Sequence, residues 1–346
     1  MLTYNRLSSK PGAFKAMTGV SIEEFQSLLS RVAPKYEALV RSQAQRVDRK
    51  RRPGGGVKSR YGLDGRLLMT MVWLKLYVTC DAIGVIFDLD KGTVSRFTRP
   101  ILQILRQLGE GTLSWPEEAR GLVEPDHGTT NPPAPPASSA EDSPEDPGPD
   151  DEGVAEDDGM RVVTPDGGNC PDYLAIVDAT EQRVERSSDY ATQKKHYSGK
   201  KKCHTIKTQV IVNERGRIRH VSDSVPGSSH DLTLLRQSGV FDQLPDGVTV
   251  MADCGYRGLQ NDLTDRSVAL PYRPKDKQVL TPEEKLHNTY ISRIRVVVEN
   301  VLCEMKHFRA LDSVFRHCLE RHNEITRAIA GILNHRIDKR LAKVPT

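Results

Sequence analysis

Three acidic residues in the second half of the chain have the types and positions to bind a divalent metal ion. Asp178 follows the apolar run YLAIV, and Asp253 follows VTVMA. Each run has the length and composition of a short buried strand, so each aspartate is expected where a strand ends. Glu299 lies further on, in SRIRVVVENVLCEMKHF. Carboxylate oxygens gathered at one edge of a sheet are ligands for Mg²⁺ or Mn²⁺ rather than for zinc.

The segment that holds Glu299, residues 292–308, has the spacing of a helix. It would place Arg295, Glu299 and Lys306 on one stripe, with apolar residues on the remaining surface. Taken alone, the stripe is explained by ion pairs on a solvated face. Together with the two aspartates it also fits a site for two metal ions about 4 Å apart, which would cleave a phosphodiester by activating water or a 3′-hydroxyl.

The composition is that of a soluble protein large enough for two domains. The chain has 346 residues, of which 37% are hydrophobic and 28% charged. No apolar run approaches the roughly 18 residues of a membrane span, and the N-terminus lacks the apolar core of a secretory signal. The six cysteines include no C-x-x-C pair. We therefore expect reduced thiols, a cytoplasmic location and no membrane partner.

The net charge of +4 conceals an uneven distribution. Residues 124–158 contain twelve Asp or Glu and no Lys or Arg. The rest of the chain has 50 basic and 34 acidic residues, a net charge of +16. This excess favours a polyanionic partner such as nucleic acid.

The N-terminal part, residues 1–119, is expected to be helical. Ser21 and Glu24 have the spacing of a capping box, which predicts a helix from Ser21. Residues 41–60 are rich in cations around a triple glycine. They suit either an arm that contacts the DNA backbone or a solvated basic linker. The cations proposed for DNA contact in this stretch are Arg49, Lys50, Arg51 and Arg52.

Residues 81–105 have the outline of a helix-turn-helix. A short helix over 81–87 and a turn are followed by Asp90, which is placed to cap a second helix over 93–105. Other small helical bundles contain such corners as well. In a helix-turn-helix the residues facing DNA would be Lys91, Thr93, Ser95, Arg96 and Arg99.

Two further regions complete the expected organisation. Residues 120–165 are rich in proline and acids, which predicts a disordered linker. Residues 166–346 change to an α/β pattern of three strands, a helix, two strands and two long helices, which predicts a mixed sheet with flanking helices. A basic loop in this region runs from Lys194 to Lys202 and includes Lys200 and Lys201, and it suits either DNA-backbone contact or simple solvation.

Four motifs in order carry a family resemblance. They are VDAT at Asp178, PGSSHD at Asp231, ADCGYRG at Asp253, and R-x₃-E-x₆-K from Arg295 to Lys306. In these motifs the chain resembles DDE superfamily transposases of bacterial insertion sequences, in the group related to PIF/Harbinger elements. The resemblance implies an RNase H-like catalytic domain that follows a DNA-binding helix-turn-helix, together with binding of terminal repeats and metal-dependent DNA strand cleavage and transfer.

The resemblance also assigns roles to residues. Asp178 matches the first family aspartate, Asp253 the second and Glu299 the glutamate, and the set implies two Mg²⁺ or Mn²⁺ ions. Asp231 also matches a recurring family position and is kept as an alternative or accessory metal ligand. Arg295 and Lys306 are the candidates for DNA contact on the same helix stripe as Glu299.

The expected partners are double-stranded DNA, as terminal repeats and as target, and further copies of the chain, because two element ends must be joined. A bacterial protein of this kind would be associated with the nucleoid when bound to DNA. Two other functions stay open at this point. One is a non-catalytic DNA-binding protein derived from such an enzyme, and the other is a metal-dependent endonuclease without strand transfer.

Overall fold

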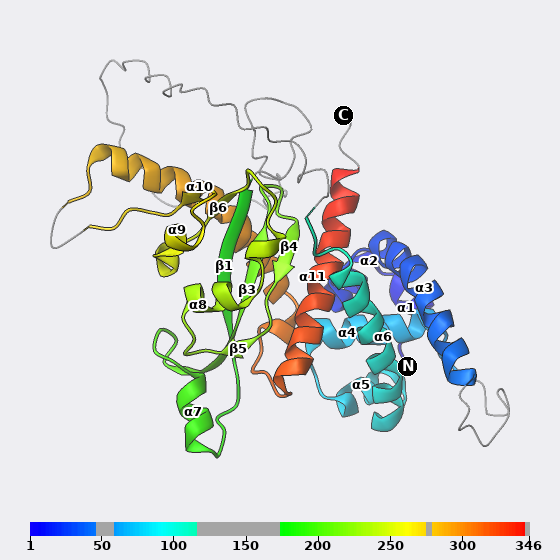
Figure 1. The fold of residues 1–346 in the computed structure, drawn as a ribbon. Coiled ribbons are helices and arrows are strands. Elements are labelled where there is room, and N and C mark those ends of the chain that lie inside the picture. The colour runs from blue at the N-terminus through cyan, green and yellow to red at the C-terminus, as the bar shows by residue number, and fades with distance from the viewer. Residues whose placement is uncertain (46–58, 116–173, 275–278, 343–346) are drawn as a thin grey trace, which may run out of the picture.

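The computed structural model describes residues 1–45, 59–115, 174–274 and 279–342, which form a group of N-terminal helices and a mixed α/β region (Figure 1). The predictions for Arg49, Lys50, Arg51 and Arg52 and for the linker at 120–165 lie outside these residues. None of the helices in the described ranges combines the length and apolar character that crossing a bilayer requires.

The N-terminal helices begin at the caps that the sequence indicates. Ser21 and Glu24 form the capping box of α3, and Asp90 accepts the N–H of Thr93 at the start of α6. The helix α6 continues through Pro100. The bounds are α1 Tyr4–Ser8, α2 Pro11–Thr18, α3 Ile22–Ala44, α4 Leu63–Leu76, α5 Cys80–Phe87 and α6 Lys91–Glu110. The helices of the expected corner are therefore present, while their use as a DNA-binding helix-turn-helix stays a prediction.

The α/β region is built on one mixed sheet in the order β2-β3-β1-β6-β7, with β4 and β5 also paired to β3. The strand β1 is antiparallel to β3 and parallel to β6. The strands are β1 Leu174–Arg183, β2 Tyr197–Ser198, β3 Cys203–Val212, β4 Ile218–Val221, β5 Val225–Pro226, β6 Thr249–Met251 and β7 Val268–Ala269. The predicted mixed α/β class with an N-terminal helical region is confirmed.

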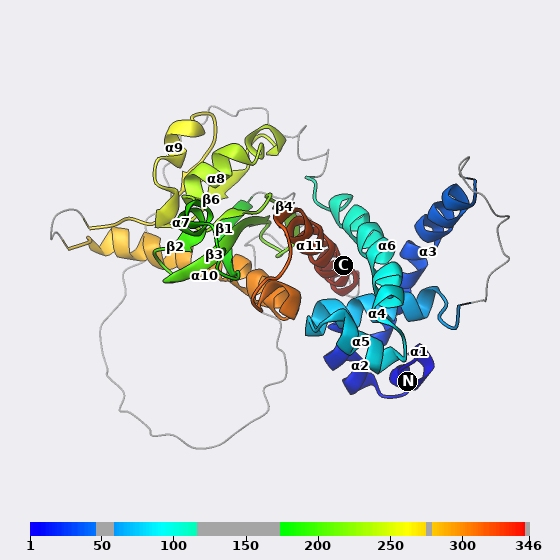
Figure 2. The ribbon, with the colours of Figure 1, turned by 90° about the horizontal axis from the view of Figure 1, so that it is seen from below.

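Helices cover both faces of this sheet (Figure 2). The long helix α10 lies on one face, where Val298 packs with Ile176 of β1, and α8 and α9 lie on the other, near Val177. The remaining elements are α7 Tyr190–His196, α8 Asp231–Gln237, η2 Phe241–Gln243, η3 Cys254–Tyr256, α9 Leu259–Asp262, α10 Pro282–Lys306, η4 Arg309–Leu311 and α11 Leu319–Leu341.

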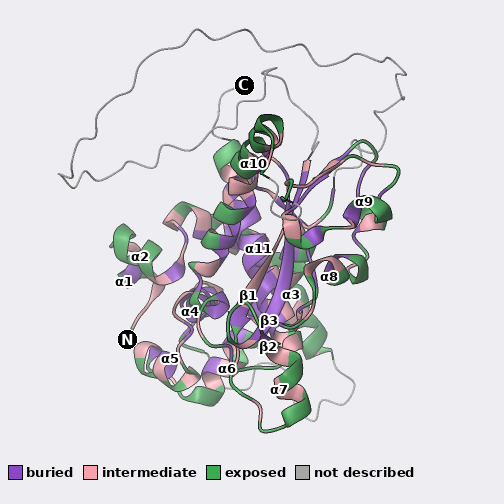
Figure 3. Cartoon of the chain, turned by 90° about the vertical axis from the view of Figure 1, so that its left-hand side faces the viewer, coloured by how far each residue is buried: buried purple, intermediate pink, exposed green. Residues whose placement is uncertain are grey.

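Two local predictions were wrong. The strand β1 does not end at Asp178, because its pairing with β3 continues to Arg183, so Asp178 lies in the middle of the strand. The basic loop before Lys200 contains a helix, α7, whose first turn is capped by Asp189 through the N–H of Thr192. Lys200, Lys201 and Lys202 themselves lie in the exposed turn after β2. Figure 3 shows the exposed surface of α7 against the buried strands.

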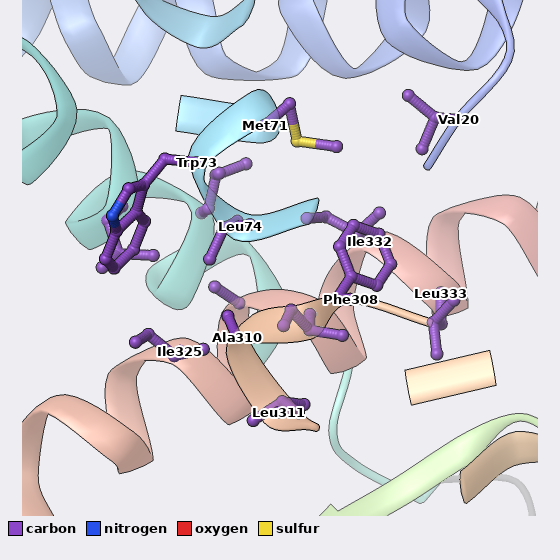
Figure 4. Packing of buried hydrophobic residues seen from close by; sticks show 14 of the residues in the cluster. Val20, Met71, Trp73, Leu74, Phe308, Ala310, Leu311, Ile325, Ile332 and Leu333 are labelled. Atoms are coloured by element: carbon purple, nitrogen blue, oxygen red, sulfur yellow. The ribbon is translucent and has the colours of Figure 1, made fainter. Parts of the chain in front are cut away.

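The helix α11 connects the two regions. It lies between the sheet and the N-terminal helices, and its Ile332 and Leu333 belong to one continuous core with Leu74 of α4 and with Phe308 (Figure 4). The fully buried Asn334 of α11 bonds both the N–H and the C=O of Ile218, which completes the outer edge of β4. The domain boundaries inferred from the sequence stay predictions.

The contact between α6 and α11 requires two glycines. A Cβ added at Gly331 would lie 2.3 Å from the Cα of Gly109, and a Cβ at Gly109 would lie 2.1 Å from the carbonyl oxygen of Arg327. Both obstructing atoms belong to the backbone, so a side chain cannot be accommodated by a change of rotamer. The two helices can approach this closely only because neither residue has a side chain.

We therefore expect Gly331→Ala to destabilise the protein by about 1–3 kcal/mol, the usual cost of overpacking. The measurement is the free energy of unfolding in urea. Gly12→Ala in α2 is the matched control, because nothing lies within 4 Å of its added Cβ. Alanine is also preferred to glycine in a helix, so the control should be neutral or stabilising. Wild-type stability in Gly331→Ala would show that the helices are not in contact at this point.

Candidate active site

The strands β1 and β6 bring Asp178 and Asp253 to the same part of the sheet. The parallel register pairs Ile176 with Met251, and each aspartate lies two residues further along its chain. The two aspartates therefore lie on neighbouring segments of the chain, close enough for the charge of Asp253 to raise the pKa of Asp178. The side chain of Asp178 lies on the same face as Ile176, the face that α10 covers.

Asp253 begins the short turn η3. Its Oδ1 accepts the N–H of Gly255 at 2.8 Å, which fixes the carboxylate above the turn. An added Cβ at Gly255 would lie 2.9 Å from Asp253 Oδ1 and 3.1 Å from Asp231 Oδ2. The two carboxylates therefore approach Gly255 together, and a side chain at this position would push them apart.

The helix α10 carries Glu299, which shares the cation Arg295 with Asp178. The Nη2 of Arg295 lies 3.6 Å from Asp178 Oδ2 and 3.8 Å from Glu299 Oε1. Only 15% of the Arg295 side chain is exposed, and its Nε is buried with no hydrogen-bond partner in the described part of the chain. Arg295 was predicted to contact DNA, and the structure places its guanidinium between two of the three predicted catalytic acids.

The environment of Asp178 opposes its ionisation. Burial raises its pKa, and the carboxylates of Asp253 and Glu299 raise it further. The N–H of Ala179, 2.8 Å from Asp178 Oδ1, and the guanidinium of Arg295 lower it. The net direction of the pKa is upward. A second cation near these oxygens would therefore favour the ionised form.

The oxygen donors fit a hard divalent cation, although they do not converge in the structure. In the described ranges no three His, Cys, Asp or Glu side chains are grouped closely enough to hold a metal ion. Carboxylates repel one another, and here Arg295 separates Asp178 from Glu299. The donor set of Asp178, Asp253 and Glu299 consists only of carboxylates, as Mg²⁺ and Mn²⁺ prefer.

A second ion-pair cluster lies on the opposite face of the sheet. The Nζ of Lys207 donates to Asp231 Oδ1 at 2.8 Å and to the carbonyl of Ser229 at 2.6 Å, and it lies 3.9 Å from Glu181 Oε1. Both Lys207 and Glu181 are almost completely buried. Asp231, held as an alternative metal ligand from sequence, is thus already paired with a cation. We call Lys207, Asp231 and Glu181 the lysine cluster.

Sequence reasoning missed the residues that support the turn of Asp253. The Nε2 of Gln209 lies 2.7 Å from the hydroxyl of the fully buried Tyr256. Burial holds the pKa of Tyr256 well above its usual value, and the nearby carboxylates act in the same direction. Lys207 and Gln209 are two residues apart on β3, so they lie on the same face of the sheet, and these polar residues within an otherwise apolar strand were the available signal.

The predicted DNA-contacting residues of α6 are partly engaged with one another. Lys91 pairs with Asp81 at 3.4 Å, and the hydroxyl of Thr93 bonds both Asp90 and Arg96. Ser95 is half-buried and Arg99 is exposed. Lys306 is half-buried on α10, two turns beyond Glu299. These residues do not lie in a single cluster with the acids.

Two comparisons with known proteins found similarities to this chain. Residues 177–334 match the family model described as DDE superfamily endonuclease. The chain is also similar to a protein of Microchaete diplosiphon named as probable transposase for insertion sequence element IS702, with 34% identity over 167 residues. That similarity covers 47% of this chain and 57% of the relative, so the chain spans little more than half of the relative's length. No solved structure matches the chain. The resemblance to insertion-sequence DDE transposases is confirmed, and the assignment to the PIF/Harbinger group stays a prediction.

The lysine cluster leads to a prediction about stability. Lys207→Met leaves Asp231 and Glu181 without their shared cation, and we expect a loss of about 3 kcal/mol because removing one partner of a buried ion pair leaves uncompensated charge. In an Asp231→Asn background less charge is left behind, so the loss should be smaller. Urea unfolding of the two single variants and the double variant gives the coupling energy, expected to be at least about 1 kcal/mol.

Lys195→Met, in the exposed helix α7, is the matched control. It should change stability by no more than about 0.5 kcal/mol, as surface substitutions usually do. Equal losses from Lys207→Met in both backgrounds would contradict the assignment of the Lys207–Asp231 pair.

Proposed function

We propose that this protein is an insertion-sequence transposase that cuts and joins DNA with Asp178, Asp253 and Glu299, because residues 177–334 match the family model described as DDE superfamily endonuclease. The observation that carries the proposal is the arrangement of these three acids. The strand register places the two aspartates on neighbouring segments, and Arg295 lies between Asp178 and Glu299 within ion-pair distance of both.

We assign the catalytic region to the RNase H-like fold. An antiparallel set of long strands, β1 and β3 with β4, continues into the shorter parallel strands β6 and β7. Helices on both faces, an acid on β1 and another just after the neighbouring strand β6 support the assignment. Glu299 then comes from a helix on one face, so residues far apart in sequence contribute to one site.

The proposed cofactor is a pair of Mg²⁺ or Mn²⁺ ions bound by Asp178, Asp253 and Glu299, with Asp231 as an accessory at most. Such ions supply a nucleophile from water or a 3′-hydroxyl and stabilise the leaving oxygen. The protein's own part is to position the acids. The Gly255 N–H orients Asp253, the Ala179 N–H orients Asp178, and Arg295 limits the repulsion between Asp178 and Glu299.

DNA is the proposed partner, as terminal repeats held by the N-terminal helices and as target. The exposed Arg99 on α6 and the exposed turn of Lys200, Lys201 and Lys202 support phosphate contacts on both sides of the molecule. Two ends must be joined in one reaction, so we propose that the protein acts as a dimer or larger assembly on DNA.

The test is cleavage of a labelled duplex that carries the repeat flanking the element, in the presence of Mg²⁺ or Mn²⁺. Asp178→Asn, Asp253→Asn and Glu299→Gln should each lower the rate by about a thousandfold or more, since the several kcal/mol of metal stabilisation correspond to that factor. EDTA should abolish cutting by the wild type. Asp231→Asn and the exposed control Asp242→Asn should still cut.

The outcomes separate the alternatives. A 3′-hydroxyl end joined to target DNA identifies a transposase, while cutting without joining identifies an endonuclease. A wild type that binds the repeat but never cuts would be a DNA-binding protein only. If Asp231→Asn is inactive while Asp253→Asn still cuts, the second metal ligand is Asp231.

A further inference from the structure

A cavity of about 630 Å³ lies away from the acids, where α2 and the end of α4 meet the end of α10 and α11. Its lining includes the side chains of Lys15, Lys75, His307 and Arg336. The first two belong to the N-terminal helices and the last two to the C-terminal part of the chain. The cavity therefore spans both regions, and its polar lining is largely cationic.

Lys75 is the best-defined cation of this cavity. Its Nζ donates to the carbonyl of His307 at 2.8 Å and lies 5.9 Å from the centre of the Phe308 ring. No carboxylate lies within ion-pair distance of Lys75 in the described ranges. Burial lowers the pKa of Lys75, and the charges of Arg336 and Arg309 lower it further. The surroundings of this ammonium are thus electropositive.

Arg336 forms ion pairs with two acids near the cavity, Glu24 and Glu304. Its guanidinium lies 3.6 Å from Glu24 Oε1 and 3.5 Å from Glu304 Oε2. Its Nε is buried and has no hydrogen-bond partner among the described residues. Lys15 is exposed at the mouth of the cavity and forms no ion pair there within the described part of the chain. Among the residues that the structure describes, the ammonium groups of Lys15 and Lys75 therefore have no carboxylate partner at this cavity.

We propose that this cavity binds an oxyanion of the phosphate class, held by Lys15 and Lys75. Phosphate oxygens accept several charge-assisted hydrogen bonds at once, and an anion here would relieve the repulsion between Lys75 and Arg336. The volume exceeds that of one phosphate ion and lies within the usual range of ligand sites, so it also admits a phosphodiester with its sugar. The anion is either free phosphate or a phosphate of the DNA backbone, and the second source rests on the proposed function.

The first experiment uses inorganic phosphate alone. Thermal unfolding is followed with increasing phosphate at constant ionic strength, with chloride as the replaced anion. Binding to the folded state should raise the melting temperature of the wild type. The rise should disappear in Lys15→Met and Lys75→Met and persist in Lys35→Met, a control on the exposed surface of α3. Lys15→Met carries the test if Lys75→Met fails to fold, because the Lys15 side chain forms no hydrogen bond in the described structure.

The proposal would be overturned if phosphate raised the melting temperature no more than chloride does. It would also be overturned if the rise with phosphate persisted in Lys15→Met. The second experiment identifies the source of the anion through the salt dependence of binding to a duplex. If the cavity takes a backbone phosphate, Lys15→Met should lower the slope of log K against log salt by about 1. If Lys15→Met keeps the wild-type salt slope but its melting temperature no longer rises with phosphate, the site binds free phosphate. A protein that responds to phosphate but binds no DNA would contradict the proposed function and leave this site in place.

Discussion

The repulsion between carboxylates is the constraint on which the rest of the site depends. Asp178, Asp253, Asp231 and Glu299 are gathered around the same strands, and Asp178 is mostly buried. Such a group is stable only if cations offset it. The protein supplies one cation on each face of the sheet, Arg295 on the side of α10 and Lys207 on the side of α8.

This division explains why the acids on the two faces of the sheet differ in their surroundings. Asp231 has its own short ion pair with Lys207, whereas Asp178 shares Arg295 with Glu299 at longer distances. Asp231 is therefore less available to a metal ion, because the ammonium of Lys207 already compensates its charge. The looser contacts leave oxygens of Asp178 and Glu299 free to accept another cation. For this reason we propose Asp253, and not Asp231, as the partner of Asp178.

The sequence predicts the elements well where local signals are strong. Capping residues give the starts of α3 and α6, and apolar runs reveal β1 and β6. It does not give the length of β1, because residues 180–183 are polar and are held in the strand by their pairing with β3. It predicts acids for the site by motif, but it gives no sign of the ion pairs of Lys207, which appear only when β3 is placed beside β1 and α8. The contact of Gly109 with Gly331 is likewise invisible until both helices are positioned.

The position of α11 also has a consequence for folding. Thr112, just beyond α6, and Asn334 of α11 are hydrogen-bonded although they lie 222 residues apart, and the N-terminal helices bury part of their apolar surface against α11. Contacts of such long sequence separation form late, because closing a long loop costs entropy before the contacts compensate for it. During synthesis, the apolar surface of the N-terminal helices that packs against α11 therefore stays exposed until α11 has been made. In that interval the chain is most open to aggregation and to chaperones.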